Sequence, residues 1–175
     1  MSKFTIAPAA AAYLVLSGAA AFADVGHGKT EAGEPGKAAD VTKTIEVVMY
    51  DNYYEPESIS VKEGETVRFI AKNMGEAVHE FNIGTAQMLI DHAPEMQMMV
   101  DHGVLEVDRI NHEAAKKMQA SMGHGEHKMA NAALVEPGKT GEVIWKFSGD
   151  GELEFGCTVP GHYDSGMVGE FSLNH

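Results

Sequence analysis

Residues 157–167 read CTVPGHYDSGM and place a cysteine, a histidine and a methionine at regular intervals: Cys157, His162 and Met167. The run lies between two β-like stretches, 152–157 and 168–173, so we expect it to form a loop that joins two strands. Thiolate, imidazole and thioether groups are ligands that soft and borderline metals prefer in proteins. The run therefore predicts a metal site on a loop of a β domain.

A second imidazole for this site is offered by His79, at the start of a predicted strand over 78–83. A sandwich brings the start of such a strand beside the 157–167 loop. Two His, one Cys and a weak axial Met form the ligand set of a mononuclear type 1 copper site, which exchanges single electrons. Zinc is the competing metal, but a structural zinc site takes four firm ligands and would leave Met167 unused. We therefore favour copper.

The chain from residue 43 onward has the texture of a β domain. Short runs of β-forming residues alternate with turn signals such as Glu63-Gly64-Glu65. The predicted strands are 44–50, 58–61, 66–72, 78–83, 141–147, 152–157 and 168–173. About seven or eight strands at this spacing predict an all-β fold, a Greek-key β-sandwich.

At these residues the sequence resembles the cupredoxin, or blue-copper, family. The Cys-x4-His-x4-Met loop is similar to those of azurin- and auracyanin-like members, and Val78-His79-Glu80-Phe81 stands where they carry their first histidine. The resemblance covers residues 43–83 and 132–175. The copper ligands that it implies are His79, Cys157 and His162 in the equatorial plane, Met167 as the axial ligand and the Val78 carbonyl on the other side.

Glu80 departs from the family pattern, in which an Asn follows the first histidine and ties the two ligand loops together. Two roles stay open at this point. Glu80 bonds Thr158, or it points to solvent and leaves Asn73 to tie the loops. Hydrogen bonds to the ligands tune their geometry and the redox potential of the metal, so this substitution bears on both.

Residues 85–131 break the strand pattern and predict a partly helical insertion. One helical piece opens near Pro94 and stops at Gly103, and a second runs over 112–122 with Asn111 as its cap. Seven of the 11 methionines and five of the nine histidines of the chain fall in this insertion. Such an enrichment distinguishes the chain from a simple electron carrier.

The insertion predicts a second, softer copper site. Thioethers favour Cu(I), imidazole also binds Cu(II), and several of these side chains share a helical face at spacings of three or four. The candidate ligands are His92, Met96, Met99, His102, Met118, Met122, His124, His127 and Met129. The alternative is that methionines pack the insertion against the sandwich, which we favour for Met88 and for one of Met98 and Met99.

The N-terminal region predicts export. Residues 1–23 resemble a secretory signal peptide, with Lys3, an alanine-rich apolar stretch and a cleavage site at Ala21-Phe22-Ala23. An uncleaved membrane anchor is the alternative, which the shortness of the apolar stretch disfavours. Residues 24–42 predict a flexible tail before a cupredoxin domain of residues 43–175. We therefore expect a periplasmic protein with no membrane contact after cleavage.

Charge and cysteine content limit the partners. The chain has 13 basic and 26 acidic residues, a net charge of −13, which argues against nucleic acid because phosphate binding takes clustered Lys and Arg. A single cysteine excludes an internal disulfide. In an oxidising compartment its thiol is buried, paired between chains, or bound to a metal.

The leading interpretation is a periplasmic type 1 copper protein that transfers single electrons and serves copper tolerance by capturing, oxidising or passing on Cu(I). Cupredoxins of periplasmic copper tolerance are similar in carrying Met/His segments. The alternative is a soluble electron shuttle between respiratory partners, whose acidic charge steers it to a basic redox protein such as a cytochrome. The same charge also serves solubility alone. We do not expect an enzyme, because copper oxidases and nitrite reductases need further copper centres.

Overall fold

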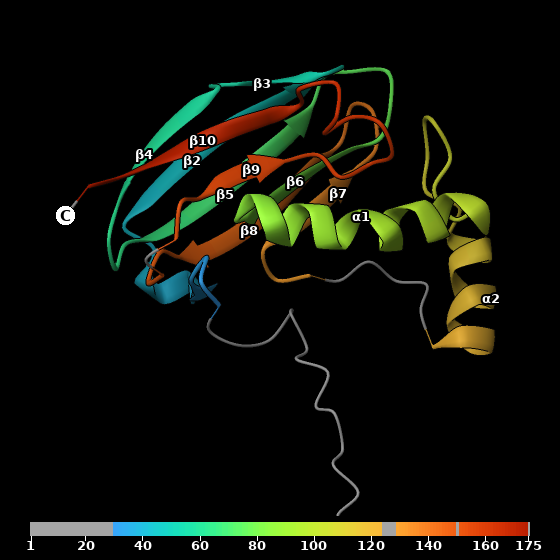
Figure 1. Cartoon of the computed structure of the whole chain (residues 1–175), viewed down its shortest axis with the longest axis horizontal. Helices are drawn as coiled ribbons and strands as arrows, with labels where there is room; N and C mark the ends of the chain where they lie inside the picture. Colours follow the sequence, from blue (N-terminus) through green and yellow to red (C-terminus); the bar gives the residue numbers. More distant parts are fainter. Residues whose placement is uncertain (1–29, 124–128, 150, 175) are drawn as a thin grey trace, which may run out of the picture.

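Two five-stranded sheets face each other in the computed structural model, which describes residues 30–123, 129–149 and 151–174 (Figure 1). The signal peptide predicted for residues 1–23 lies outside the described residues. So do the two candidate copper ligands His124 and His127.

The strand orders are β1-β8-β5-β2-β3 and β4-β10-β9-β6-β7. The first sheet consists of β1 (Glu34–Pro35), β8 (Thr140–Lys146), β5 (Thr66–Asn73), β2 (Lys43–Tyr50) and β3 (Tyr53–Glu55). The second consists of β4 (Ser58–Lys62), β10 (Val168–Asn174), β9 (Glu154–Gly156), β6 (His79–Gly84) and β7 (Ala132–Val135). The pairs β2–β5 and β4–β10 are parallel, and the other pairs of described strands are antiparallel. The predicted all-β sandwich is confirmed.

Aromatic side chains form the centre of the core. The rings of Tyr54, Phe81 and Phe155 lie 5.1 to 6.3 Å apart in edge-on and tilted contacts, which stabilise aromatic clusters beyond simple burial. Phe81 lies on β6 and Phe155 on β9, each two residues along the chain from a predicted ligand, His79 and Cys157. Because side chains two apart in a strand share a face, the core fixes the strand ends that carry these two donors.

The segment that precedes β2 is not a free tail. We expected residues 24–42 to be flexible, but within the described part β1 pairs with β8 and a 3-10 turn, η1, follows at Ala38–Asp40. Ala32 is fully buried, and the Trp145 indole donates a 2.9 Å hydrogen bond to its carbonyl oxygen. The expectation is corrected for residues 30–42, because a small residue here covers a buried indole that needs an acceptor.

The first helix of the insertion, α1 (Ala86–Asp101), begins earlier than predicted. Its N-cap is Thr85, whose hydroxyl accepts a 3.3 Å hydrogen bond from the Met88 amide. Pro94 lies inside the helix rather than near its start. Both Pro94 and Ile90, whose carbonyl loses its helical partner, lie on the exposed face, where water is available to that carbonyl.

The second helix, α2 (His112–Met122), has the predicted bounds. The Asn111 side chain accepts a 3.0 Å hydrogen bond from the Ala114 amide, and Gly123 ends the helix with a φ of 74°. Figure 1 shows α1 running along the sandwich and α2 near the C-terminal end of α1. Within the described ranges, neither helix has the length and apolar character that a membrane crossing requires.

A second apolar cluster holds the insertion to the sandwich. Its buried members are Val78, Met96, Met99, Val104, Leu105 and Met118. It joins the residue before β6 to both helices and to the connection between them. Packing therefore accounts for three of the candidate copper-binding methionines.

Replacement of Met96 by alanine tests this packing. Met96 is fully buried, whereas Met122 is 46% exposed. Met96→Ala is expected to lower the free energy of unfolding of the metal-free protein by about 2–5 kcal/mol, and Met122→Ala by less than about 0.5 kcal/mol. Urea denaturation followed by circular dichroism measures both. Equal losses in the two variants would contradict the assigned packing.

Candidate metal centre

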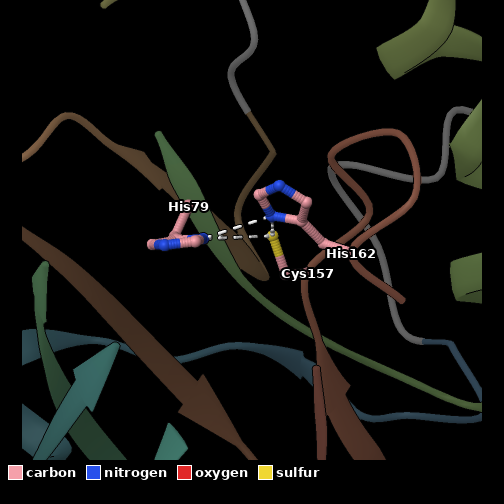
Figure 2. Close-up of side chains that lie close together, drawn as sticks. All are labelled: His79, Cys157 and His162. Carbon is pink, nitrogen blue, oxygen red and sulfur yellow. Dashed lines mark hydrogen bonds between the residues drawn. The ribbon is translucent and has the colours of Figure 1, made fainter. Parts of the chain in front are cut away.

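Three donor side chains, one from β6 and two from the loop after β9, converge at one end of the sandwich (Figure 2). His79 opens β6, Cys157 directly follows β9, and His162 lies in the loop between β9 and β10. The Cys157 sulfur lies 3.3 Å from Nδ1 of His162 and 4.0 Å from Nδ1 of His79, and the two nitrogens are 3.2 Å apart. Metal bonds of about 2.0–2.3 Å, the range for imidazole and thiolate ligands, require donor separations of this size. The three residues fit one metal ion.

The pairing of β6 with β9 brings the first two donors together. Asn82 lies opposite Gly156, and continuing this antiparallel register beyond β9 places Glu80 opposite Thr158. The Glu80 amide accordingly donates a 3.3 Å hydrogen bond to the Cys157 sulfur. Strand register, rather than loop flexibility, therefore sets the distance between His79 and Cys157.

The loop after β9 is closed by its own backbone. The Cys157 amide donates to the Met167 carbonyl at 3.1 Å, and the Met167 amide donates to the His162 carbonyl at 3.0 Å. Two glycines in this loop, Gly161 and Gly166, have φ of 84° and 95°, which side-chain-bearing residues rarely adopt. Met167 is fully buried beside Cys157 in the main core. Its role as the axial ligand stays a prediction, as does that of the Val78 carbonyl.

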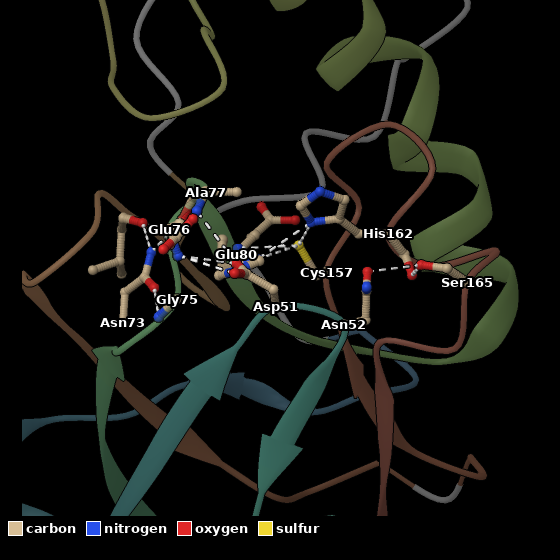
Figure 3. Close-up of polar contacts among 12 residues, drawn as sticks. Asp51, Asn52, Asn73, Gly75, Glu76, Ala77, Glu80, Cys157, His162 and Ser165 are labelled. Atoms are coloured by element: carbon tan, nitrogen blue, oxygen red, sulfur yellow. Dashed lines mark hydrogen bonds and ion pairs between the residues drawn. The ribbon is translucent and has the colours of Figure 1, made fainter.

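Glu80 takes the first of its two expected roles. One carboxylate oxygen, Oε2, accepts a 2.5 Å hydrogen bond from the Thr158 hydroxyl and a 3.4 Å bond from the Thr158 amide. The alternative, that Glu80 points to solvent, is wrong, because its side chain is fully buried. Asn73 instead donates to the carbonyls of Ala77 and Val135, each at 2.8 Å (Figure 3). Asn73 thus braces the turn before β6, while Glu80 ties β6 to the cysteine.

Asp51 is a functional neighbour that the sequence analysis missed. Its Oδ1 lies 2.8 Å from Nε2 of His79, the ring nitrogen that faces away from Cys157. Burial alone would raise the pKa of Asp51, but hydrogen bonds from the Glu76 and Ala77 amides and from His79 lower it. Asp51 therefore stays ionised and fixes the orientation of the His79 ring, as carboxylates do for metal-binding histidines.

The protonation states of the metal-free donors follow from burial. Burial raises the pKa of the Cys157 thiol to about 12, despite hydrogen bonds from backbone amides. Burial and the nearby His79 lower the pKa of His162. At neutral pH the thiol is protonated and His162 is neutral, so metal binding releases the thiol proton.

His162 lies at the edge of the protein, beside an apolar recess. The recess has a volume of about 560 Å³, and its apolar lining includes Val100, Val107, Val159 and Pro160. Val107, from the connection between α1 and α2, is 80% exposed. Of the three donors, His162 alone is not fully buried.

The described candidates for the second site lie in different environments. Among the described residues, the one group of three or more His, Cys, Asp or Glu side chains close enough to share a metal is His79, Cys157 and His162. Met96, Met99 and Met118 lie in the apolar cluster. His102 and Met122 are exposed, and Met129 is partly buried.

The prediction of His92 as a copper ligand is corrected by the structure. His92 is buried, with Nε2 at 3.5 Å from Oε1 of Glu80 and Nδ1 at 3.4 Å from Oε2 of Glu95. Carboxylates thus take both ring nitrogens. The helical periodicity correctly placed His92 and Met96 on one face, but that face is turned toward the sandwich.

Comparison with known proteins decides the family. Residues 9–97 match the family model described as a cupredoxin-like domain. The chain belongs to the cupredoxin family. This confirms the resemblance drawn from the sequence, and the His-Cys-His donor set of a cupredoxin indicates copper as the cofactor.

Curated relatives span nearly the whole cupredoxin chain. It is 43% identical to the copper-resistant cuproprotein CopI of Pseudomonas aeruginosa over 169 residues, which cover 91% of each chain. It is 35% identical to CopI of Rubrivivax gelatinosus, with 97% of this chain and 98% of the relative covered. It is 30% identical to CopI of Vibrio cholerae, with 84% of this chain and 75% of the relative covered.

Solved structures support the fold. Auracyanin B matches with a TM-score of 0.59 at 19% identity, covering 82% of this cupredoxin and 96% of that chain. The dithionite-reduced auracyanin of Roseiflexus castenholzii matches with a TM-score of 0.54 at 20% identity, covering 77% of this cupredoxin and 99% of that chain. Both comparisons agree with the two-sheet sandwich described above.

Asp51→Asn tests the carboxylate behind His79. The carboxylate charge of Asp51 orients the His79 ring and makes its other nitrogen a stronger donor. The substitution removes this charge, so Cu(II) affinity is expected to fall by about 10- to 100-fold. Competition with a chelator of known affinity measures it. Asp101→Asn, at the end of α1, is the matched control and should bind as wild type does. Equal affinity of Asp51→Asn and wild type would contradict the role of Asp51.

The His92 pairing predicts a pH-dependent contribution to stability. Burial alone would lower the pKa of His92, but Glu80 and Glu95 raise it from 6.5 to about 9. A histidine with a raised pKa in the folded state stabilises fully below the unfolded pKa and loses this contribution as pH rises through the folded value. The stability difference between wild type and His92→Gln should therefore shrink between pH 6.5 and 9. A difference that grows over this range in urea denaturation would contradict the pairing.

Proposed function

We propose that this chain is an exported copper-resistance protein that holds one copper ion at a type 1 site and exchanges single electrons there. The observation that carries the proposal is the convergence of His79, Cys157 and His162, with donor atoms within 4.8 Å of one another. The relatives named copper-resistant cuproproteins support the physiological role. The predicted signal peptide over residues 1–23 supports a periplasmic location.

The proposed equatorial ligands are His79, Cys157 and His162, and Met167 is the proposed axial ligand. Bound copper would supply one-electron chemistry at this site. The protein contributes a sulfur that is shielded from water and oxidants, because Cys157 is fully buried. It also contributes the imidazoles of His79 and His162, which β6 and the loop after β9 hold with their Nδ1 atoms 3.2 Å apart. Such a fixed donor set limits how much the site rearranges between Cu(I) and Cu(II).

We also propose that the outer part of the insertion captures further Cu(I). We leave out His92, which is paired with carboxylates. We also leave out Met96, Met99 and Met118, which are buried in the second apolar cluster. Among the described residues, His102, Met122 and Met129 are left as donors. His124 and His127, which lie outside the described residues, stay candidates from the sequence. Met122 supports this role, since it ends α2 with its side chain 46% exposed.

Copper titration of the metal-free mature protein tests both parts. Under anaerobic reducing conditions with a competing Cu(I) chelator, wild type should bind one tight equivalent and at least one weaker one. Cys157→Ser should lose the tight equivalent, because the serine hydroxyl is a hard and poor ligand for Cu(I). Tight binding that survives in Cys157→Ser would contradict the proposed centre.

Substitution of the accessible donors separates the second site from the first. Met122→Ala combined with His102→Ala should weaken the further equivalents and leave the tight one unchanged. Met74→Ala, whose side chain is 63% exposed outside the insertion, is the matched control. A single equivalent in wild type would refute the second site alone.

A second candidate function is a soluble electron shuttle between respiratory partners. The observation that favours it is the apolar recess beside His162, through which an electron would leave the centre toward a docked redox protein. The net charge of −13 would steer that docking in a salt-dependent way. Growth of a deletion strain discriminates: copper sensitivity with normal respiration supports resistance, and the reverse supports the shuttle.

A further inference from the structure

A carboxylate lies buried one residue from a proposed copper ligand. Glu80 has no exposed side-chain surface and sits within β6, between the cysteine loop and α1. An ionised carboxylate in such a place is costly unless hydrogen bonds and an opposite charge compensate it. Thr158 supplies hydrogen bonds to Oε2 from its hydroxyl and its amide. Thr158 carries no charge, so the counter-charge must come from elsewhere.

His92 of α1 supplies this counter-charge. Its Nε2 lies 3.5 Å from Oε1 of Glu80, the oxygen that Thr158 does not occupy. The pKa of His92 is raised to about 9, so the ring is cationic at neutral pH. The other buried residues of α1 are Leu89, Met96 and Met99. The inner face of α1 therefore presents one polar group to the sandwich, and that group meets Glu80.

We propose that Glu80 and His92 are positioning residues: a buried ion pair through which the helical insertion holds the cysteine loop and sets the reduction potential of the copper. This inference rests on the proposed function, because it takes Cys157 as a copper ligand. The chain from the insertion to the metal is short. His92 pairs with the Glu80 carboxylate, the carboxylate holds Thr158, and the Glu80 amide donates to the Cys157 sulfur.

The pair explains why the insertion and the departure at residue 80 occur together. The Asn of the family pattern is neutral and needs no counter-charge, whereas a Glu at this position does. The insertion supplies the opposite charge, because His92 lies on its first helix. Glu95, whose side chain is 46% exposed, holds the other nitrogen of His92 from the solvent side and orients the ring.

The electrostatic role predicts shifts of opposite sign. A negative charge near the metal stabilises Cu(II) over Cu(I), and a positive charge does the reverse. Glu80→Gln keeps an oxygen for Thr158 but removes the negative charge, so the potential should rise. His92→Gln removes the positive charge, so the potential should fall. Each change should alter the ratio of Cu(II) to Cu(I) affinity by about tenfold, and the double variant should return close to wild type.

Redox titration of the copper-loaded protein at pH 7, followed by visible and electron paramagnetic spectra, measures these shifts. Asp101→Asn, an exposed carboxylate at the end of α1, is the matched control and should leave the potential close to that of wild type, because water screens an exposed charge. Shifts of the same sign in Glu80→Gln and His92→Gln, or no shift in either, would overturn the proposal. A role in packing alone predicts no such reversal of sign.

Unfolding of the metal-free variants tests the ion pair without copper. His92→Gln takes an opposite charge away from the buried Glu80, and Glu80→Gln takes one away from the buried His92, so the double variant Glu80→Gln/His92→Gln should be more stable than the worse single variant. A single variant that fails to fold while the double variant folds gives the same support. Additive losses would overturn the pair. Because this cycle needs no metal, it stands or falls separately from the ligand role of Cys157.

Discussion

The antiparallel pairing of β6 with β9 is the interaction on which the rest of the metal centre depends. It sets Asn82 opposite Gly156 and thereby brings His79 to the cysteine loop. A Cβ at Gly156 would lie 2.8 Å from Cδ1 of Leu89 on α1, so a larger residue there would displace the Leu89 side chain. A register shift of one residue would turn every side chain of β6 to the opposite face. The same pairing therefore fixes the aromatic core, the donor triangle and the seat of the insertion.

Charge balance is the second constraint at this end of the sandwich. Buried ionisable groups are stable only when neighbours compensate them, and here each has a specific neighbour. Asp51 lies against the outer nitrogen of His79, and His92 lies against Glu80. Cys157 is the exception in the metal-free protein, since burial holds its thiol protonated. A bound cation would compensate the thiolate that forms when this proton leaves, which explains why a thiol in this position suits a metal.

The donor triangle could be predicted because residue type and spacing carry the chemistry. Cys157, His162 and Met167 lie on one short loop, and His79 opens a strand that a sandwich brings close. Asp51 could not be found in this way. It follows β2 with no ligand motif around it, and its contact with His79 depends on how the turn folds over β6.

The insertion shows where pattern reasoning reaches its limit. Its second helix followed the predicted bounds because Asn111 and Gly123 are strong local signals. The predicted start of α1 was wrong, because Pro94 suggested the first turn of a helix, whereas the helix begins after its N-cap Thr85. Helical spacing placed His92 on a shared face with methionines, but spacing cannot tell an inward face from an outward one. Because the sandwich packs against that face, the methionines are buried in an apolar cluster and His92 pairs with Glu80.

X-ray absorption at the copper edge of the loaded protein shows whether one copper is held by a thiolate and two imidazoles. We expect one short copper–sulfur distance of about 2.3 Å and two copper–nitrogen distances of about 2.0 Å, as for other borderline metals on these ligands. In Cys157→Ser the short sulfur distance should vanish. Copper bound in the wild type by nitrogen and oxygen atoms alone would contradict a thiolate ligand at Cys157.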